Sequence, residues 1–394
     1  MPSTTLQEPS FTFGIEEEYH LVDRITRDLT PAPPELMDAC LARLGGQVSP
    51  EFLKSQIEIG TPACRTFREA RRHLAALRGT IGEIATGFGC APIAASTHPF
   101  AHHLDQKTTE RERYQNLAQE MQGVGRRLMV CGMHVHVAIE DYELRIDLMN
   151  QVRYFLPHLL ALSASSPFWQ GQDTGLKSYR LTVMQALPRT GMPGRFSGRA
   201  EYERTVDVLV KAGVIEDATK IWWDLRPSHR FPTLEERITD VCTRLDDALS
   251  VAALYVCICR MLYRQRRGNL TWRAYPVFLL NENRWRAQRY GVQGTLFDLG
   301  KGTLAPFTDL LGEILTLIAE DAAALGCEAE VAHASEIAAE GTSADRQVAT
   351  YERLRASGAS DEEALKGVVD MLIHETLAGT RVPPPLQGPP AGMS

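Results

Sequence analysis

The segment Phe13–Val22, FGIEEEYHLV, most restricts what this chain can fold into. It has the alternating pattern of a buried β-strand, yet it contains three consecutive glutamates. Because side chains alternate across a strand, Glu16 and Glu18 share one face and Glu17 shares the other with apolar residues. The Cα atoms of Glu16 and Glu18 would be about 6.6 Å apart. Carboxylates are costly to bury without a positive partner, so the pattern predicts a cation opposite Glu16 and Glu18, and a separate partner or an exposed edge for Glu17.

Three other predicted strands also place polar groups on one face. The segments SQIEIGTP, CGMHVHVAI and TLEERITD present Gln56 with Glu58, His134 with His136, and Glu235 with Arg237. Each pattern alone also fits a solvated edge, a structural histidine or an ordinary salt bridge. Their coincidence on short strands of one chain favours a shared site. Oxygen ligands with one imidazole suit hard divalent ions, Mg²⁺ or Mn²⁺.

Composition excludes several classes of protein. The formal charge of −7 over 394 residues argues against a nucleic-acid binder, which needs a basic face. The apolar stretches are too short to span a bilayer, and the N-terminal segment MPSTTLQEPS lacks the features of a signal peptide. Eight cysteines without a CxxC pair fit reduced thiols. We therefore expect a cytoplasmic enzyme that acts on small molecules and uses neither a membrane nor a nucleic acid.

Hydrophobic periodicity predicts strands in the first half and mostly helices in the second. The predicted strands are 11–23, 52–59, 129–139, 178–187 and 234–240, with a further candidate at 220–226. A capping box at Thr66 and Glu69 predicts the start of a helix. Further helices are predicted at 105–128, 142–163 with a bend at Pro157, 242–265, 275–290, 304–325, 344–357 and 361–377.

The alternation of polar and apolar residues favours an antiparallel sheet over a parallel one. The expected class is α+β, with a single catalytic domain at 11–378. Its mixed α/β part covers 11–240 and its mainly helical part 241–378, and residues 1–10 and 380–394 are expected to be flexible tails.

Several arginines are candidates for anion binding, because the planar guanidinium suits carboxylate and phosphate. Arg180 follows DTGLKSY, Arg226 lies in WWDLRPS, and Arg284 and Arg289 lie in NENRWRAQRYG. A solvated helical face explains the last two equally well. The chain contains neither a GxxxxGK[ST] loop nor a GxGxxG turn after a strand. A bound nucleotide would therefore be held by metals and arginines.

Eight motifs in order resemble those of one family. They are GIEEEYHLVD, SQIEIGTPAC, STHPF, CGMHVHVAI, ALSASSPFWQGQDTGLKSYR, WWDLRPS, TLEERITDV and NENRWRAQRYG. Together they resemble the YbdK-type carboxylate–amine ligases, the type 2 glutamate–cysteine ligase group of the glutamine-synthetase-like ligases, from about Phe11 to Asp298. The resemblance implies a curved, mainly antiparallel sheet that forms a funnel, with helices outside. It also implies ATP and Mg²⁺ or Mn²⁺ as cofactors, and amide-bond formation through an acyl phosphate.

The resemblance also implies roles for single residues. The pattern Gly-Ile-Glu-x-Glu makes Glu16 and Glu18 metal ligands, as strand parity does independently. The same comparison implies metal ligands at Glu51, Glu58, His134 and Glu235, although Glu51 has the wrong parity for one unbroken strand with Glu58. Catalytic or phosphate-binding roles fall to Arg237, Arg226 and Arg180, and cofactor contacts to Arg284, Arg289 and His136. Glu236 is charged where relatives carry an uncharged residue, and it should face away from the site.

Other functions stay open at this stage. The HVH pattern with carboxylates also suits a metal-dependent hydrolase or amidase that activates water. A ligase fold can also be retained in a protein that only binds a nucleotide or metabolite. Glutamate and cysteine are the first expectation for the acid and the amine, and the family suggests a homodimer. His136 and Glu17 are the candidates for the base that deprotonates the amine.

Overall fold

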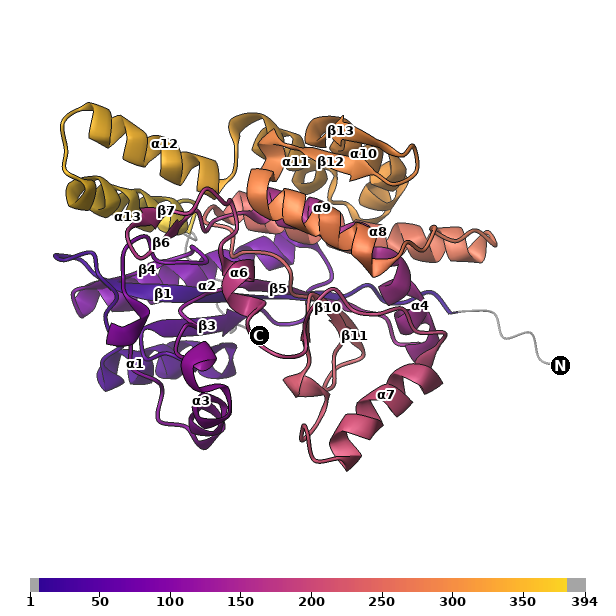
Figure 1. The fold of residues 1–394 in the computed structure, drawn as a ribbon, viewed down its shortest axis with the longest axis horizontal. Coiled ribbons are helices and arrows are strands. Elements are labelled where there is room, and N and C mark those ends of the chain that lie inside the picture. Colours follow the sequence, from indigo (N-terminus) through magenta and orange to yellow (C-terminus); the bar gives the residue numbers. More distant parts are fainter. Residues whose placement is uncertain (1–6, 381–394) are drawn as a thin grey trace, which may run out of the picture.

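The computed structural model describes residues 7–380 and centres on one seven-stranded sheet (Figure 1). The strand order is β10-β11-β5-β1-β3-β2, with β4 also pairing with β1, and all these pairs are antiparallel. The strands are β1 (Phe13–Asp23), β2 (Val48–Pro50), β3 (Gln56–Gly60), β4 (Cys90–Ile93), β5 (Met133–Ala138), β10 (Leu225–Pro227) and β11 (Thr233–Glu236). The expected α+β class with an antiparallel sheet is confirmed.

Helices pack on both sides of this sheet, with the later helices of the chain gathered on one side (Figure 1). Helices α8 to α13 lie on that side, whereas α3 and α7 flank the opposite side. The helices are α1 (Pro34–Leu44), α2 (Phe67–Gly87), α3 (Glu112–Gly125), α4 (Tyr142–Val152), α5 (Leu156–Ser163), α6 (Arg180–Met184), α7 (Arg199–Lys211), α8 (Leu245–Arg267), α9 (Val277–Tyr290), α10 (Phe307–Leu325), α11 (Glu328–Glu340), α12 (Ser343–Ala356) and α13 (Asp361–Leu377).

Three two-stranded ribbons complete the fold. They are β6 (Phe168–Trp169) with β7 (Gln172–Asp173), β8 (Thr190–Gly191) with β9 (Trp222–Trp223), and β12 (Thr295–Asp298) with β13 (Thr303–Pro306). Among residues 7–380, no helix combines the length and the apolar character that crossing a membrane requires. Residues 1–6 and 381–394, which belong to the expected tails, lie outside the described residues.

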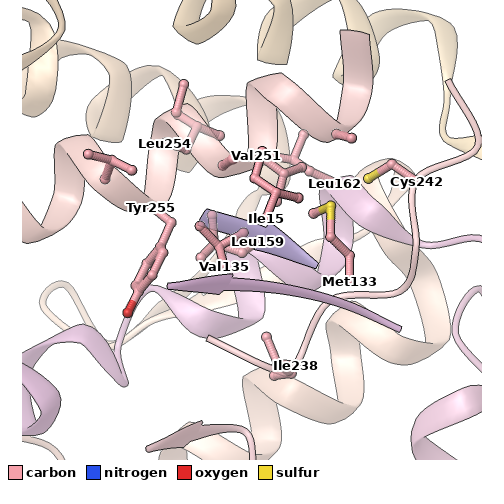
Figure 2. Close-up of a cluster of buried hydrophobic side chains, with 14 of the residues drawn as sticks. Ile15, Met133, Val135, Leu159, Leu162, Ile238, Cys242, Val251, Leu254 and Tyr255 are labelled. Atoms are coloured by element: carbon pink, nitrogen blue, oxygen red, sulfur yellow. The ribbon is translucent and has the colours of Figure 1, made fainter. Parts of the chain in front are cut away.

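The apolar face of the sheet is sealed by α8 (Figure 2). Ile15 of β1 and Val135 of β5 point toward Val251 and Leu254 of α8, and all four side chains are buried. Burial of each such side chain contributes roughly 1.5–3 kcal/mol. Because the period of a strand is two, this packing forces the neighbouring residues of β1 and β5 toward the opposite face.

Glu17 lies on the sealed face, and its partner is an arginine. The guanidinium of Arg78, from α2, donates to both carboxylate oxygens of Glu17 at 2.6 and 2.9 Å, and both side chains are fully buried. Tyr19 also donates its hydroxyl to Glu17, while Arg78 donates to the carbonyl oxygens of Cys242 and Thr243. Glu17 has no access to the other face of the sheet, so its candidacy as the catalytic base was wrong.

Replacing Glu17 by leucine should strongly destabilise the protein, because it leaves the buried Arg78 cation without its counter-charge. We expect a loss of about 3–5 kcal/mol in the free energy of unfolding, measured by urea denaturation. Glu83→Gln is the matched control, since Glu83 pairs with Arg43 on the surface, and it should change the midpoint little. Equal effects of the two substitutions would contradict the assignment.

The predicted strand at 178–187 was wrong, because this segment is a turn followed by α6. Its alternation of residues is strand-like, but tertiary hydrogen bonds anchor it in another conformation. The backbone N–H groups of Lys177 and Ser178 donate to the carbonyl of Gln288, and the Ser178 hydroxyl donates to Asp240. The segment therefore pairs with no strand of the main sheet.

Other predicted boundaries also shifted, for local reasons. The helix predicted at 142–163 is two helices, α4 and α5, and Pro157 is the second residue of α5, where its missing N–H costs nothing. The strand predicted at 52–59 begins only at Gln56, because a turn closes from Leu53 to Gln56. The capping box at Thr66 is confirmed. Periodicity missed α1, α7 and α11.

An ionic network ties α11, α12 and α13 to the start of α8. Asp247 of α8 accepts hydrogen bonds from His333 and Arg346, and Glu375 of α13 accepts from Arg346 and Arg244. Hydrogen bonds to Asp247 and Glu336 raise the pKa of His333 to about 9. The late helical segment is thus held to α8 by charge as well as by apolar packing.

The stabilising effect of His333 should depend on pH. Its pKa is raised on folding, so its contribution is complete below the unfolded value of about 6.5 and disappears as the pH rises through about 9. We expect His333→Gln to be less stable than the wild type at pH 6 and equally stable at pH 10. Urea denaturation of both proteins across this range measures the difference. A difference that stays constant with pH would contradict the prediction.

Candidate active site

A row of polar side chains crosses the open face of the sheet. Residues directly opposite each other in antiparallel strands project to the same side. The strand register pairs Ser49 with Glu58, Glu58 with Glu18, Glu16 with His134, His136 with Glu235, and Glu235 with Arg226. Six strands therefore contribute to one continuous polar row: β2, β3, β1, β5, β11 and β10.

This row forms the floor of a cavity of about 420 Å³. His136, Arg226 and Arg237 line it. All six predicted metal ligands line it as well: Glu16, Glu18, Glu51, Glu58, His134 and Glu235. Glu51 follows the short strand β2, and β2 forms a hairpin with β3. Glu51 and Glu58 therefore do not lie on one strand, and both can face the cavity although an odd number of positions separates them in the sequence.

Three carboxylates at one end of the row repel one another. Burial and the negative charge of Glu51 raise the pKa of Glu18 to about 7. Burial and the charges of Glu51 and Glu16 raise the pKa of Glu58 to about 8. Glu18 accepts a hydrogen bond from the Gly132 backbone N–H at 2.7 Å, and Glu58 accepts one from Ser49 at 3.1 Å. This end of the cavity therefore concentrates carboxylates.

The other end is rich in positive charge. Arg226 donates to both carboxylate oxygens of Glu235 at 2.9 and 3.2 Å, and Arg237 donates to the same carboxylate. Against the effect of burial, Arg237 and Arg226 hold the pKa of Glu235 far below its usual range. Glu235 is thus ionised at every physiological pH, and it holds two guanidinium groups at the cavity wall.

The two histidines of the row differ in protonation. Burial and nearby Arg237 lower the pKa of His134 to about 4, so this imidazole is neutral at pH 7 and its 3.5 Å contact with Glu16 is not an ion pair. For His136, Glu16 and Glu235 outweigh burial and raise the pKa. His136 also lies 3.3 Å from Glu16 and 3.0 Å from Thr233. A neutral imidazole is the form that binds a metal.

The donor set fits a hard divalent cation chemically. Clustered carboxylates with one neutral imidazole match the ligands that Mg²⁺ and Mn²⁺ take, and a cation would relieve the repulsion among Glu18, Glu51 and Glu58. Within residues 7–380, no three acidic, imidazole or thiol groups are already arranged around one point as metal ligands. Side-chain movement would accompany cation binding.

Arg180 lies beside this acidic end and is almost fully buried. It donates to the backbone carbonyls of Ile238 and Arg237, both at 3.2 Å. It packs directly over Gly132, where an added Cβ would lie 2.9 Å from the guanidinium carbon. Gly132 is a site residue that strand parity could not find, because its contribution is the absence of a side chain.

On the carboxylate–amine ligase chemistry that the motifs imply, Gly132→Ala should displace the Arg180 guanidinium and weaken use of the acid substrate. We expect kcat/KM for the acid to fall by at least about tenfold, with little change in the KM for ATP. Steady-state measurement of ADP release, with the acid and ATP varied in turn, shows whether kcat/KM for the acid falls while the KM for ATP stays the same. An unchanged kcat/KM for the acid in a folded variant would contradict the role of this close contact.

Arg284 and Arg289 do not line this cavity. Arg284 forms a buried ion pair with Asp224 at 2.7 Å, which joins α9 to the segment before β10. Arg289 donates to the carbonyl of Gly175 and stacks on Tyr290. The structure thus gives both arginines roles in packing, and neither contributes to the site described here.

Glu236, as expected, faces away from the cavity and accepts hydrogen bonds from Thr239 on the buried side.

Sequence reasoning also missed several residues that line the cavity. The missed residues lie just before α3, in the segment that leads through the two-residue strand β9 to β10, and in the loop after β10, all too short or irregular to show a strand period: Arg111, Lys220, Trp222, Arg230 and Phe231.

A sheet that gathers acidic groups and arginines around one cavity is typical of enzymes that handle phosphate with divalent cations. The chain belongs to the glutamate–cysteine ligase family 2, whose model matches residues 12–371. It is 61% identical over 378 residues to a Rhodospirillum rubrum protein named "Putative glutamate--cysteine ligase 2", with 95% of this chain and 97% of that protein covered. The chain is therefore a ligase of the glutamate–cysteine ligase class, as the motifs implied.

Solved structures share this fold at low sequence identity. A bifunctional glutathione synthetase from Pasteurella multocida matches with a TM-score of 0.66 and 16% identity, over 93% of this chain and 52% of that one. A glutamate–cysteine ligase from Francisella tularensis, in complex with AMP, matches with a TM-score of 0.63 and 12% identity, over 93% and 89% of the two chains. These structures support the fold class.

Proposed function

We propose that this ligase joins a small carboxylic acid to an amine at the expense of ATP, through an acyl phosphate. A carboxylate oxygen attacks the γ-phosphorus and ADP leaves. The amine nitrogen then attacks the acyl carbon, phosphate leaves, and the nitrogen loses a proton. The observation that carries this proposal is that one sheet face places acidic groups and guanidinium groups around a single cavity.

The acidic residues of the row would hold the divalent cations. We assign this role to Glu16, Glu18, Glu51, Glu58, His134 and Glu235, which all line the cavity. When bound, Mg²⁺ or Mn²⁺ neutralises the phosphate oxygens of ATP. Repulsion among Glu18, Glu51 and Glu58 supports the assignment, because a bound cation would relieve it.

The arginines of the site would orient the anions. Arg237 and Arg226 share Glu235, which holds both guanidinium groups in place before any ligand binds. Donors fixed in advance can stabilise the charge that builds up on the transferred phosphoryl group. Arg180 would bind the carboxylate substrate at the opposite, acidic end. His136, which lines the cavity, is the remaining candidate for the base that deprotonates the amine.

Glutamate and cysteine form the first pair to test, because the names of the relatives carry them. A metal-dependent hydrolase would release product without consuming ATP, and a protein that only binds ATP would release no ADP. Amine-dependent ADP release therefore separates the three functions. Location in the cytoplasm and assembly as a homodimer remain predictions.

Glu235→Gln should abolish most of the activity. It removes the carboxylate that holds Arg226 and Arg237, and a metal ligand with it. We expect amine-dependent ADP release to fall at least about 100-fold. Mass spectrometry of the products, combined with ADP measurement across acids and amines, identifies the pair to use.

Glu236→Gln is the matched control for this experiment. Glu236 is the next residue along the same strand, and it is buried on the opposite face. Burial raises its pKa to about 8, so at neutral pH it is largely protonated and glutamine resembles it closely. Equal losses in the two variants would mean that Glu235 acts only through the stability of β11.

A further inference from the structure

The cavity has a narrow extension that points to a particular class of acid. Resting on the ligase function proposed above, we propose that the acid substrate is a monocarboxylic acid with an apolar body. Its carboxylate would bind beside Arg180, and its body would fill the extension. The relatives' names instead lead to glutamate, which carries two further charged groups.

The extension opens from the acidic end of the row. Its volume is about 120 Å³, and it shares six side chains with the main cavity: Glu18, Glu51, Leu117, His134, Trp222 and Arg237. Beyond these groups the wall is apolar, formed by residues from three separate parts of the chain: Phe52, Leu128, Val130, Met184 and Leu187. The polar and apolar parts of a ligand would therefore occupy opposite ends of the extension.

Arg180 supplies the positive charge at the wall of this extension. Its side chain is 4% exposed, and within residues 7–380 it has no carboxylate at ion-pair distance. Its two hydrogen bonds go to the backbone carbonyls of Ile238 and Arg237, and these use only part of the five N–H groups of a guanidinium. The charge of Arg180 opposes the burial that raises the pKa of Glu18, Glu236 and Asp240, but none of these carboxylates forms an ion pair with it, and an incompletely paired buried cation is unfavourable. A substrate carboxylate would provide that counter-ion with a paired hydrogen-bond geometry.

A network of serines around Asp240 holds Arg180 in position. Asp240 accepts hydrogen bonds from the Ser165 backbone N–H and from the hydroxyl groups of Ser166 and Ser178. The Ser166 hydroxyl in turn accepts from the backbone N–H of Arg180. The start of α6 is thereby fixed, which places Arg180 and Met184 of the same short helix on the extension.

The apolar part of the extension has no partner for a second charged group of the acid. Apart from Arg180 and the six residues shared with the main cavity, the polar side chain that lines the extension is Gln56. The Gln56 amide donates to the carbonyl of Val130 and the sulfur of Cys131, and it accepts from the Leu53 backbone N–H. In this apolar part, the ammonium or second carboxylate of glutamate would lose its hydration without replacement, because Glu18, Glu51 and Arg237 lie at the end shared with the main cavity.

Size alone does not decide between the acids. At the 10–15 Å³ that a water-sized occupant needs, 120 Å³ admits a molecule of roughly ten non-hydrogen atoms. Glutamate, benzoate and short branched acids all fit that limit. The chemistry of the wall makes the selection, because five apolar side chains favour a hydrocarbon body.

The first experiment compares acids with the wild-type protein. With ATP and Mg²⁺, hydroxylamine serves as a general amine, and both ADP and the acyl hydroxamate are measured. We expect kcat/KM for 3-methylbutanoate or benzoate to exceed that for glutamate or aspartate by at least about tenfold. Equal or better use of glutamate would overturn the inference and leave the ligase function standing.

Direct binding separates failure of the inference from failure of the function. Isothermal titration calorimetry measures binding of 3-methylbutanoate and of glutamate to the protein without turnover. Tighter binding of 3-methylbutanoate supports the inference even if no acid supports ADP release, in which case the ligase function fails. The absence of binding by any apolar acid at millimolar concentration overturns the inference.

Met184→Arg tests the apolar wall itself. A second cation opposite Arg180 should shift the preference toward glutarate, a dicarboxylic acid without an ammonium group. We expect the ratio of kcat/KM for glutarate to that for 3-methylbutanoate to rise at least about tenfold. An unchanged ratio in the folded variant would place the acid elsewhere in the cavity.

Gln185→Arg is the matched control, because Gln185 is the next residue along the chain and is exposed outside the cavity. It adds the same charge and should leave the ratio unchanged. Thermal denaturation checks that both variants are folded. Met184→Gln is the milder alternative if Met184→Arg does not fold, and it should weaken calorimetric binding of 3-methylbutanoate. Unchanged binding would contradict the role of this wall.

Discussion

The alternation of side chains along β1 is the constraint on which the whole site depends. Helix α8 seals one face of the strand with apolar side chains, and this packing pins the register of β1 and β5. Glu16 and Glu18 are consequently held on the opposite face, although carboxylates crowded together are unfavourable. The energy of the apolar core thus maintains an acidic surface that would not form by itself.

Three sets of arginines complete this arrangement, two of them paired with glutamates. Arg78 neutralises Glu17 on the sealed face and so permits three glutamates in a row. Glu235 holds Arg226 and Arg237 at the positive end of the cavity. Arg180 is positioned by backbone carbonyls instead of a carboxylate, so its charge is available to a ligand. The role of each of these arginines in this fold therefore follows from its hydrogen-bond partners.

The family establishes the ligase class, whereas the walls of the cavity bear on the substrate. Solved structures at 12% and 16% identity share the fold, and a fold hosts many specificities. The residues that differ among such enzymes are expected in loops and short helices around the sheet. Around this cavity such positions lie on α3, α6, the two-residue strand β9 and the loop after β10, which carry Leu117, Met184, Trp222 and Phe231.

Strand periodicity predicted which residues of each strand share a face, and the family motifs joined those faces in one site. Glu16, Glu18, Glu58, His134 and Glu235 were assigned by parity and motif, and all line one cavity. Parity could not place Glu51, because a turn separates it from Glu58 and restarts the count of alternation. Nor could it distinguish Arg284, which pairs with Asp224, from the arginines that reach the cavity.

The sequence by itself determined the antiparallel class, the acidic face of β1 and the motifs of the family, because these are local and periodic properties. Only the tertiary structure decided that Arg78 meets Glu17, that Gly132 makes room for Arg180, and that an apolar extension adjoins the acids. Those features join segments that are distant in the chain. No local pattern specifies such contacts, since they arise when helices and loops pack around the completed sheet.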